Sequence, residues 1–210
     1  AEEDWACEAR RYYIGIVGKY GAQTQALLKK AAGLDIAIIC PLHGPVLTEN
    51  LGYYINLYDI WSSYRPEDEG VLIAYTSVYG NTKAAAELLA EKLEARGEKV
   101  SVHDLARTDM AEAVEDAFRM SKLIVAASSY DANVFPPMYD FLHHLKLKAY
   151  QKRRVGIIEN GSWAPSAGRV MKEMLAAMKD IDLVEPMVTI RSTMQPTDEP
   201  AMKALAEAII

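Results

Sequence analysis

Short apolar runs alternate with amphipathic segments along the chain from residue 69 onward. Runs such as VLIAYTS and KLIVAAS are almost wholly apolar, which is typical of strands buried on both faces of a parallel sheet. Between these runs, apolar residues recur at helical period. The pattern predicts strands at 71–77, 99–105, 122–128, 153–160 and 183–191. It predicts helices at 81–96, 109–120, 136–150, 167–179 and 197–210.

Strands that alternate with helices in this way describe an α/β fold with a doubly wound, five-stranded parallel sheet. Pro186 lies within the last strand, which indicates an edge position or a late start of the strand, because proline cannot donate to a sheet ladder. In such sheets, ligands bind beyond the carboxyl ends of the strands, near the switch point in strand order. We therefore expect the functional site in the loops that follow the first, third and fourth strands.

Residues 1–68 have a different, mostly helical pattern. We expect a helix over 4–31 that is bent by its glycines, a short strand over 33–41, and a second helix over 48–64. A polar linker, RPEDEG, follows. Two helices and one strand bury too little apolar surface to form a core alone, so this partial segment should pack on something else. Cys40 ends the apolar stretch DIAIIC and is expected to be buried.

The composition of the chain restricts which binding partners and which cellular compartment we expect. The formal net charge of −6 disfavours nucleic acid and anionic membrane as partners, because both attract basic surfaces. No apolar run approaches the roughly 20 residues that cross a bilayer, and the acidic opening AEEDW does not resemble a signal peptide. The two cysteines, Cys7 and Cys40, are far apart and form no disulfide framework. We expect a cytoplasmic location.

The loop after the first predicted strand reads TSVYGNT, residues 76–82. A helix N-terminus follows it, where unpaired N–H groups attract anions, and hydroxyls and a glycine allow a phosphate to come close. The loop has neither the GK[ST] ending of an ATP-binding P-loop nor a GxGxxG dinucleotide motif. It therefore predicts a neutral cradle for one terminal phosphate. The alternative interpretation is an ordinary capped turn between a strand and a helix.

This loop resembles the phosphate loop of flavodoxins, which hold FMN. Two further loops, SSYDANVFPPMYDFL at 128–142 and ENGSWAPSAGRV at 159–170, correspond to those that enclose the flavin ring in flavodoxin-like proteins. A flat ring needs aromatic faces, which Tyr130 or Phe135 could supply on one side and Trp163 on the other, although core packing is an alternative for Phe135 and Trp163. The resemblance implies these cofactor-binding residues: Thr76, Ser77, Val78, Tyr79, Gly80, Asn81, Thr82, Ser128, Ser129, Tyr130, Asp131, Ala132, Asn133, Phe135, Asn160, Gly161, Ser162 and Trp163.

The first 68 residues narrow the resemblance. The segments DWACEARRYYIGIVGKYG and ICPLHGPV, a tyrosine-rich helix and then a flavodoxin-like domain resemble the flavodiiron proteins, also called A-type flavoproteins. The resemblance implies that residues 1–68 are the C-terminal remnant of a metallo-β-lactamase-like domain plus a linker, and that 69–210 are the flavodoxin-like FMN-binding domain. It also implies that His43 occupies the position of a diiron ligand. The family's H-x-E-x-D-H motif is missing from the chain, so we do not expect His43 to hold iron by itself.

The resemblance implies an FMN-binding electron-transfer domain of a flavodiiron-type oxygen or nitric oxide reductase, from which most of the diiron site is missing. We expect the chain to be the C-terminal portion of a longer protein that carries the diiron centre, and we do not expect it to reduce oxygen or nitric oxide alone. The resemblance further implies a homodimer and a small, rubredoxin-like electron donor. No catalytic side chain is required, because the flavin carries the redox chemistry. The alternatives are an FMN-dependent NAD(P)H/quinone oxidoreductase and a flavin-free remnant that acts as a binding module.

Overall fold

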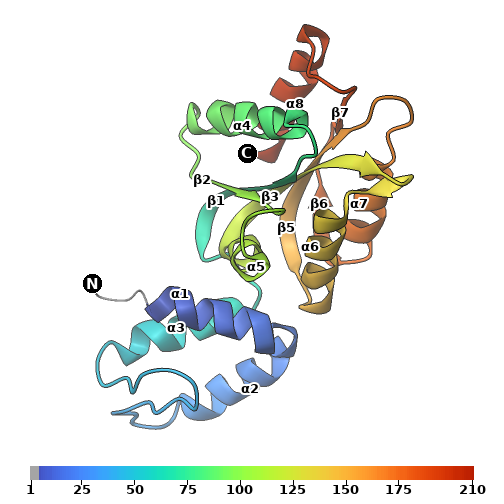
Figure 1. Cartoon of the computed structure of the whole chain (residues 1–210). Helices are drawn as coiled ribbons and strands as arrows, with labels where there is room; N and C mark the ends of the chain where they lie inside the picture. Colours follow the sequence, from blue (N-terminus) through green and yellow to red (C-terminus); the bar gives the residue numbers. More distant parts are fainter. Residues whose placement is uncertain (1–4) are drawn as a thin grey trace.

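The computed structural model describes residues 5–210, in which a twisted sheet lies between two layers of helices (Figure 1). Asp4, where the first predicted helix starts, and the rest of the acidic opening lie outside the described residues. The main strands are parallel and follow the order β2-β1-β3-β5-β6. Their bounds are Asp68–Thr76 (β1), Val100–Asp104 (β2), Met120–Tyr130 (β3), Gln151–Asn160 (β5) and Lys179–Leu183 (β6). The predicted doubly wound α/β fold is thus confirmed.

The strand predicted at 183–191 is shorter, since it is formed only at β7 (Val188–Ile190), and the sequence prediction missed the short strand β6 that precedes it. Both β6 and β7 pair with β5, and Pro186 lies in the gap between them. A proline cannot donate to the ladder, so pairing stops there and resumes nearer the carboxyl end of β5. The predicted edge position is correct. A further two-residue strand, β4 (Asn133–Val134), turns back antiparallel to the end of β3.

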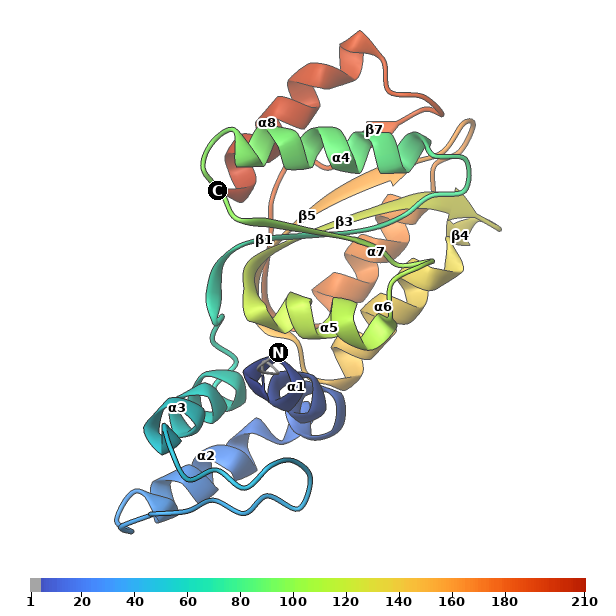
Figure 2. The same ribbon diagram turned by 60° about the vertical axis from the view of Figure 1, so that its left-hand side comes forward.

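Helices cover both faces of the sheet (Figure 2). Helices α4 (Asn81–Glu94) and α8 (Glu199–Ile209) share one face. Helices α5 (Met110–Arg119), α6 (Pro136–Leu147) and α7 (Ala167–Ala176) cover the other. Among the helices of residues 5–210, none is long and apolar enough to cross a membrane.

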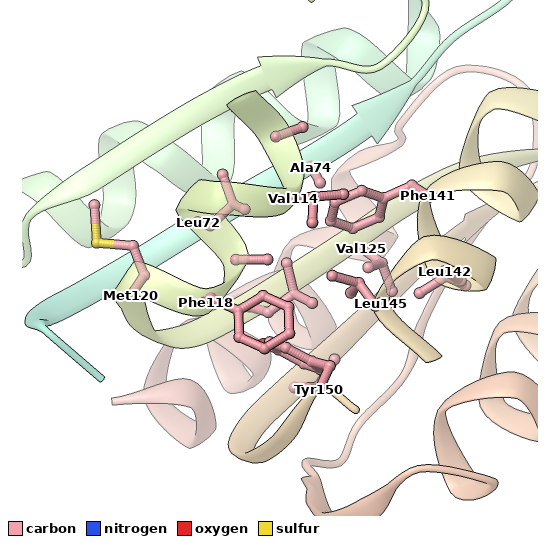
Figure 3. Close-up of a cluster of buried hydrophobic side chains, with 14 of the residues drawn as sticks. Leu72, Ala74, Val114, Phe118, Met120, Val125, Phe141, Leu142, Leu145 and Tyr150 are labelled. Carbon is pink, nitrogen blue, oxygen red and sulfur yellow. The ribbon is translucent and has the colours of Figure 1, made fainter. Parts of the chain in front are cut away.

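The core on the α5–α6 side is packed from several elements that are far apart in the sequence (Figure 3). Leu72 of β1 and Val125 of β3 share one buried cluster with Phe118 of α5 and Phe141 of α6. Tyr150 meets Phe118 edge-on with ring centroids 5.2 Å apart. All five side chains are at most 5% exposed. Because the apolar runs of β1 and β3 are buried on both faces, these two strands show no alternation in the sequence.

The segment before the sheet is helical, as predicted, and its glycines interrupt it. Helices α1 (Trp5–Tyr12) and α2 (Gly21–Ala31) are joined by a π-helical turn and a 3-10 turn, and α3 (Leu51–Ser62) follows later. The strand predicted at 33–41 is wrong. Only one bridge forms there, between Ile39 and Leu47, so no ladder develops. Cys40 is exposed rather than buried, because nothing described covers this segment.

This segment packs against the α5 side of the sheet domain, as its small size led us to expect. Tyr13, Ile14 and Trp61 belong to the same apolar cluster as the strands of the sheet. The polar stretch RPEDEG is not a free linker, since β1 already begins within it at Asp68 and Glu67 is engaged in a network of ion pairs.

Arg10 of α1 lies at the centre of that network and is 5% exposed. Its Nε and Nη2 atoms donate to the two carboxylate oxygens of Glu67 at 2.7 and 2.6 Å. Its Nη1 atom donates to Glu115 of α5 at 2.5 Å. Burial lowers the pKa of Arg10, but hydrogen bonds to Glu67 and the charges of both carboxylates raise it to a net value above the usual range. The guanidinium therefore fixes α1 to the sheet domain as a permanent cation.

Candidate functional site

A cavity of about 250 Å³ opens at the carboxyl ends of β1, β3 and β5, the side on the right in Figure 2. The three predicted loops converge there, because parallel strands all end at the same side of the sheet. Of the described residues that line it, none carries a formal charge. The lining residues are Ser77, Val78, Tyr79, Asn81, Thr82, Ser128, Ser129, Asn160, Gly161, Ser162, Trp163, Ala164 and Ser192.

The loop between β1 and α4 presents a helix N-terminus to the cavity. Gly80 adopts a φ of +91°, which a side chain would disfavour, and its N–H donates to Ser77 Oγ at 3.0 Å. No side chain in the described structure caps α4. The N–H groups of its first turn, at Asn81 and Thr82, are therefore available to an anion, and the helix dipole favours one there.

Two threonines near this helix N-terminus differ in whether their hydroxyls are hydrogen-bonded. Thr82 Oγ1 lies 3.0 Å from Ser128 Oγ, which joins the first loop to the second. Thr76, the last residue of β1, is fully buried, and its hydroxyl has no hydrogen-bond partner among residues 5–210. A buried unpaired hydroxyl costs free energy, so such groups in native proteins normally have a reason. Thr76 does not itself line the cavity, but it directly precedes Ser77, which does.

The second and third loops are held together mainly by Ser129. Its Oγ accepts from the backbone N–H groups of Ser166 at 2.8 Å and Ala167 at 3.2 Å, so it caps α7. Gly161 lies against it, because a Cβ there would come within 2.9 Å of Ser129 Oγ and 3.0 Å of Pro165 Cα. Ser129 thus shapes the cavity wall, and with both acceptor sites engaged it has only its O–H donor left for a ligand.

Two aromatic side chains stand at the cavity and are almost fully exposed. Trp163 is 92% and Tyr79 91% exposed, although aromatic rings usually bury most of their surface. The other two predicted ring contacts lie elsewhere. Tyr130 and Phe135 meet each other with ring centroids 5.4 Å apart, and Tyr130 lines a separate hollow together with Tyr139.

A tight hairpin explains why part of the second loop leaves the cavity. Asp131 and Ala132 have φ values of +49° and +55° and form the two-residue turn between β3 and β4. The turn carries the chain away from the strand ends. The structure therefore brings eleven of the eighteen predicted residues to the cavity. The seven that do not line it are Thr76, Gly80, Tyr130, Asp131, Ala132, Asn133 and Phe135.

Replacing Ala132 with glycine is expected to stabilise the protein. A left-handed conformation is unfavourable for alanine and free for glycine, so A132G should raise the free energy of unfolding by about 1 kcal/mol in a urea titration. Ala106 provides the control, because it is also exposed in a turn but has no positive φ. A106G should destabilise by about 0.5 kcal/mol through added chain entropy. Equal effects of the two substitutions would contradict the strain at Ala132.

Sequence reasoning missed two lining residues, Ala164 and Ser192. Ala164 simply follows Trp163 in the same loop. Ser192 comes from the loop after β7, which no recognised motif marks. The rule that ligands meet the carboxyl ends of strands was the available signal, and it applies to the last strand as well.

His43 lies apart from this cavity, in the loop between α2 and α3. Its ring is exposed and contacts that of Tyr12, with centroids 5.2 Å apart. It borders an apolar cavity of about 530 Å³ formed by α1, α2 and α3. Within the part of the chain that the structure describes, no group of three or more His, Cys, Asp or Glu side chains could hold a metal ion.

Comparison with known proteins identifies the sheet domain. A family model for the flavodoxin domain matches residues 72–185. The anaerobic nitric oxide reductase flavorubredoxin of Aeromonas hydrophila is 23% identical over 181 residues, which cover 84% of this chain and 36% of that protein.

Solved structures agree in fold over nearly the whole chain. Rubredoxin oxygen:oxidoreductase from Desulfovibrio gigas has a TM-score of 0.89 at 22% identity and covers 97% of this chain and 51% of that one. The flavodiiron protein from Giardia intestinalis has a TM-score of 0.84 at 18% identity, with 95% and 50% covered. The chain therefore spans about half the length, or less, of these three proteins. The resemblance to the flavodiiron proteins, which we inferred from the segments DWACEARRYYIGIVGKYG and ICPLHGPV, is confirmed.

Proposed function

The chain belongs to the flavodoxin domain family, and on that premise we propose that it binds FMN and transfers electrons through it. The observation that carries the proposal is the convergence of a helix N-terminus, a hydroxyl-rich loop and exposed aromatic rings on one uncharged cavity. FMN has the matching parts, which are a phosphate, a polyhydroxyl chain and a flat ring. When bound, the flavin supplies reversible uptake of electrons.

The phosphate fits the α4 end of the cavity. The first-turn N–H groups of Asn81 and Thr82 can donate to it. We propose that a phosphate oxygen also reaches the unpaired hydroxyl of Thr76, which lies directly before the lining residue Ser77. With no cation in the cavity lining, the backbone and the hydroxyls have to neutralise the phosphate. Ser77 orders the loop through its bond to Gly80.

The flavin ring fits the other end, beside Trp163. A tryptophan that is 92% exposed offers a free aromatic face, and stacking on it would bury that face. Tyr79 offers a second ring at the same cavity and is a better placed partner than Tyr130 or Phe135, which do not line it. The task of these residues is to orient the ring and keep one side of it from water.

We further propose that the wider role is that of the flavodiiron-type proteins which the chain resembles. Residues 69–210 would form the FMN-binding domain, and 1–68 would be the remnant of a metallo-β-lactamase-like domain plus linker. The names of the relatives, a nitric oxide reductase and a rubredoxin oxygen:oxidoreductase, support reduction of nitric oxide or oxygen at an iron centre as the parent activity. Electrons would come from a rubredoxin-like protein, and the assembly would be a homodimer. His43 alone offers one imidazole ligand toward such a centre.

The test is retention of flavin. The purified chain is mixed with FMN and desalted, and its visible spectrum is recorded before and after dithionite. We expect an oxidised-flavin spectrum that is retained on desalting and bleaches on reduction. W163A should weaken binding about tenfold through lost stacking, whereas Y139A should not, since that half-exposed tyrosine lies outside the cavity.

Two results would contradict the proposal. A colourless protein after desalting would favour the flavin-free binding module. A flavin that is bleached by NADH and reoxidised by a quinone at a high turnover rate would favour the NAD(P)H/quinone oxidoreductase.

A further inference from the structure

The loop after β7 contains a residue in a costly backbone conformation. Ser192 has a φ of +63°, in the left-handed region that residues with a Cβ avoid. Such conformations persist only where the surroundings fix them, and they gather at binding sites. Ser192 also lines the cavity, although its loop belongs to none of the three that sequence reasoning assigned to the site.

Asn160, at the end of β5, fixes this conformation. It is 6% exposed, its Nδ2 donates to the Ser192 carbonyl oxygen at 2.7 Å, and its Oδ1 accepts from the Ser192 N–H at 3.1 Å. The neighbouring Gly161 N–H donates to the Ile190 carbonyl oxygen at 3.0 Å. Both ends of the Asn160 amide are therefore engaged with one residue of the next strand's loop.

The result is a pair of hydroxyls in the cavity. Ser192 Oγ lies 2.6 Å from Ser162 Oγ of the third loop. Each hydroxyl can donate one hydrogen bond and accept two, so a pair that satisfies itself with one bond still has capacity for a polyhydroxyl ligand. Both residues line the cavity.

The same loop spans the distance between the two ends of the cavity. Thr193 Oγ1 donates to Asn81 Oδ1 at 3.4 Å, at the helix N-terminus. Arg191 Nη1 donates to the Trp163 carbonyl oxygen at 3.3 Å, at the aromatic end. Ser192 lies between these two tethers. The part of FMN that lies between its phosphate and its ring is the ribityl chain.

We propose that Ser192, paired with Ser162, binds the ribityl hydroxyls of FMN, and that Asn160 is a positioning residue that acts by holding Ser192. This assignment rests on the proposed FMN site and adds a fourth loop to it. In this assignment Asn160 does not contact the flavin, because its amide is engaged with protein backbone.

The test compares three flavins with two variants. Dissociation constants are measured by fluorescence quenching for FMN, riboflavin and lumiflavin, which has a methyl group in place of the ribityl chain. S192A and S192G should both weaken FMN and riboflavin binding about fivefold to tenfold, the effect of one lost hydrogen bond, and leave lumiflavin unchanged. S192G should also unfold at a higher denaturant concentration than wild type, because glycine relieves the left-handed strain.

Weaker flavin binding together with higher stability in S192G would show that Ser192 contacts the ligand and does not only shape the loop. If Ser192 only shaped the loop, the more stable S192G would bind flavins as well as wild type does. Asn160 is tested by a double-mutant cycle: N160A should weaken FMN binding in the wild-type background and add nothing in the S192A background. T197A, which removes an exposed hydroxyl outside the cavity, is the control and should leave all three constants unchanged.

The outcomes distinguish this inference from the proposed function. A wild-type protein that binds none of the three flavins would overturn the FMN site itself. Wild-type binding that S192A and S192G leave unchanged would overturn only the role of Ser192. An equal loss for lumiflavin would assign Ser192 to the ring instead of the ribityl chain, and additive effects of N160A and S192A would give Asn160 a contact of its own.

Discussion

Replacing Arg10 with alanine is expected to lower the free energy of unfolding by about 3–5 kcal/mol, because it leaves the largely buried Glu67 without a cation and the buried Glu115 with only the partly exposed Arg11. Glu67 and Glu115 both bond to Arg10, and the Glu67 carboxylate also accepts from Trp61 Nε1 at 2.7 Å. The network joins α1, the start of β1 and α5. Urea unfolding followed by tryptophan fluorescence would report the loss, since Trp5 and Trp61 lie in the affected segment.

The neighbouring arginine provides a matched control. Arg11 also contacts Glu115, at 3.3 Å, but its side chain is 31% exposed. R11A should therefore cost no more than about 1 kcal/mol, as exposed ion pairs do. If R10A and R11A had equal small effects, the apolar contacts of Tyr13, Ile14 and Trp61 alone would hold the segment on the sheet domain.

The centre of the sheet could be predicted because β1 and β3 are buried on both faces over most of their length, so each one contains a continuous apolar run. The same criterion failed at 33–41, which is just as apolar. A strand needs a neighbour, and within residues 5–210 this segment forms one bridge, to Leu47. The exposure of Cys40 has the same cause, since the apolar character of a segment does not reveal whether anything covers it. At the last strand, Pro186 was read correctly as an edge signal, whereas β6 was missed because its sequence, KDIDL, contains no apolar run.

The cavity could be predicted in part because loop position follows from strand order. Its phosphate end needed only the residues of one loop, 76–82, whose local sequence contains the helix start and the glycine. The aromatic end depended on backbone angles that sequence does not reveal. Nothing in the pair Asp131–Ala132 indicates two positive φ values, which are usual for Asn-Gly or Asp-Gly. Ser192 depended on a side chain 32 residues away, Asn160.

Replacing Thr76 with valine is expected to stabilise the flavin-free protein and to weaken its binding of FMN. The Thr76 hydroxyl is fully buried without a partner, so its removal should raise the free energy of unfolding by about 1 kcal/mol. Valine has nearly the same shape and suits a strand. If the hydroxyl donates to the phosphate, a bond to a charged group is lost, and the dissociation constant for FMN should rise about tenfold or more.

Thr82 is the control that separates a hydroxyl reserved for ligand from one used in the fold. It is 1% exposed, and its hydroxyl is already paired with Ser128 at 3.0 Å. T82V should therefore destabilise the flavin-free protein by about 1 kcal/mol, because it leaves Ser128 unpaired. Riboflavin, which has no phosphate, should bind T76V and wild type equally. A T76V protein that is less stable than wild type would mean that the hydroxyl is not an unsatisfied group, and unchanged FMN binding would exclude it from the phosphate site. The opposite signs of the T76V effects on stability and on binding are therefore the signature of a residue kept for its ligand at a cost to the fold.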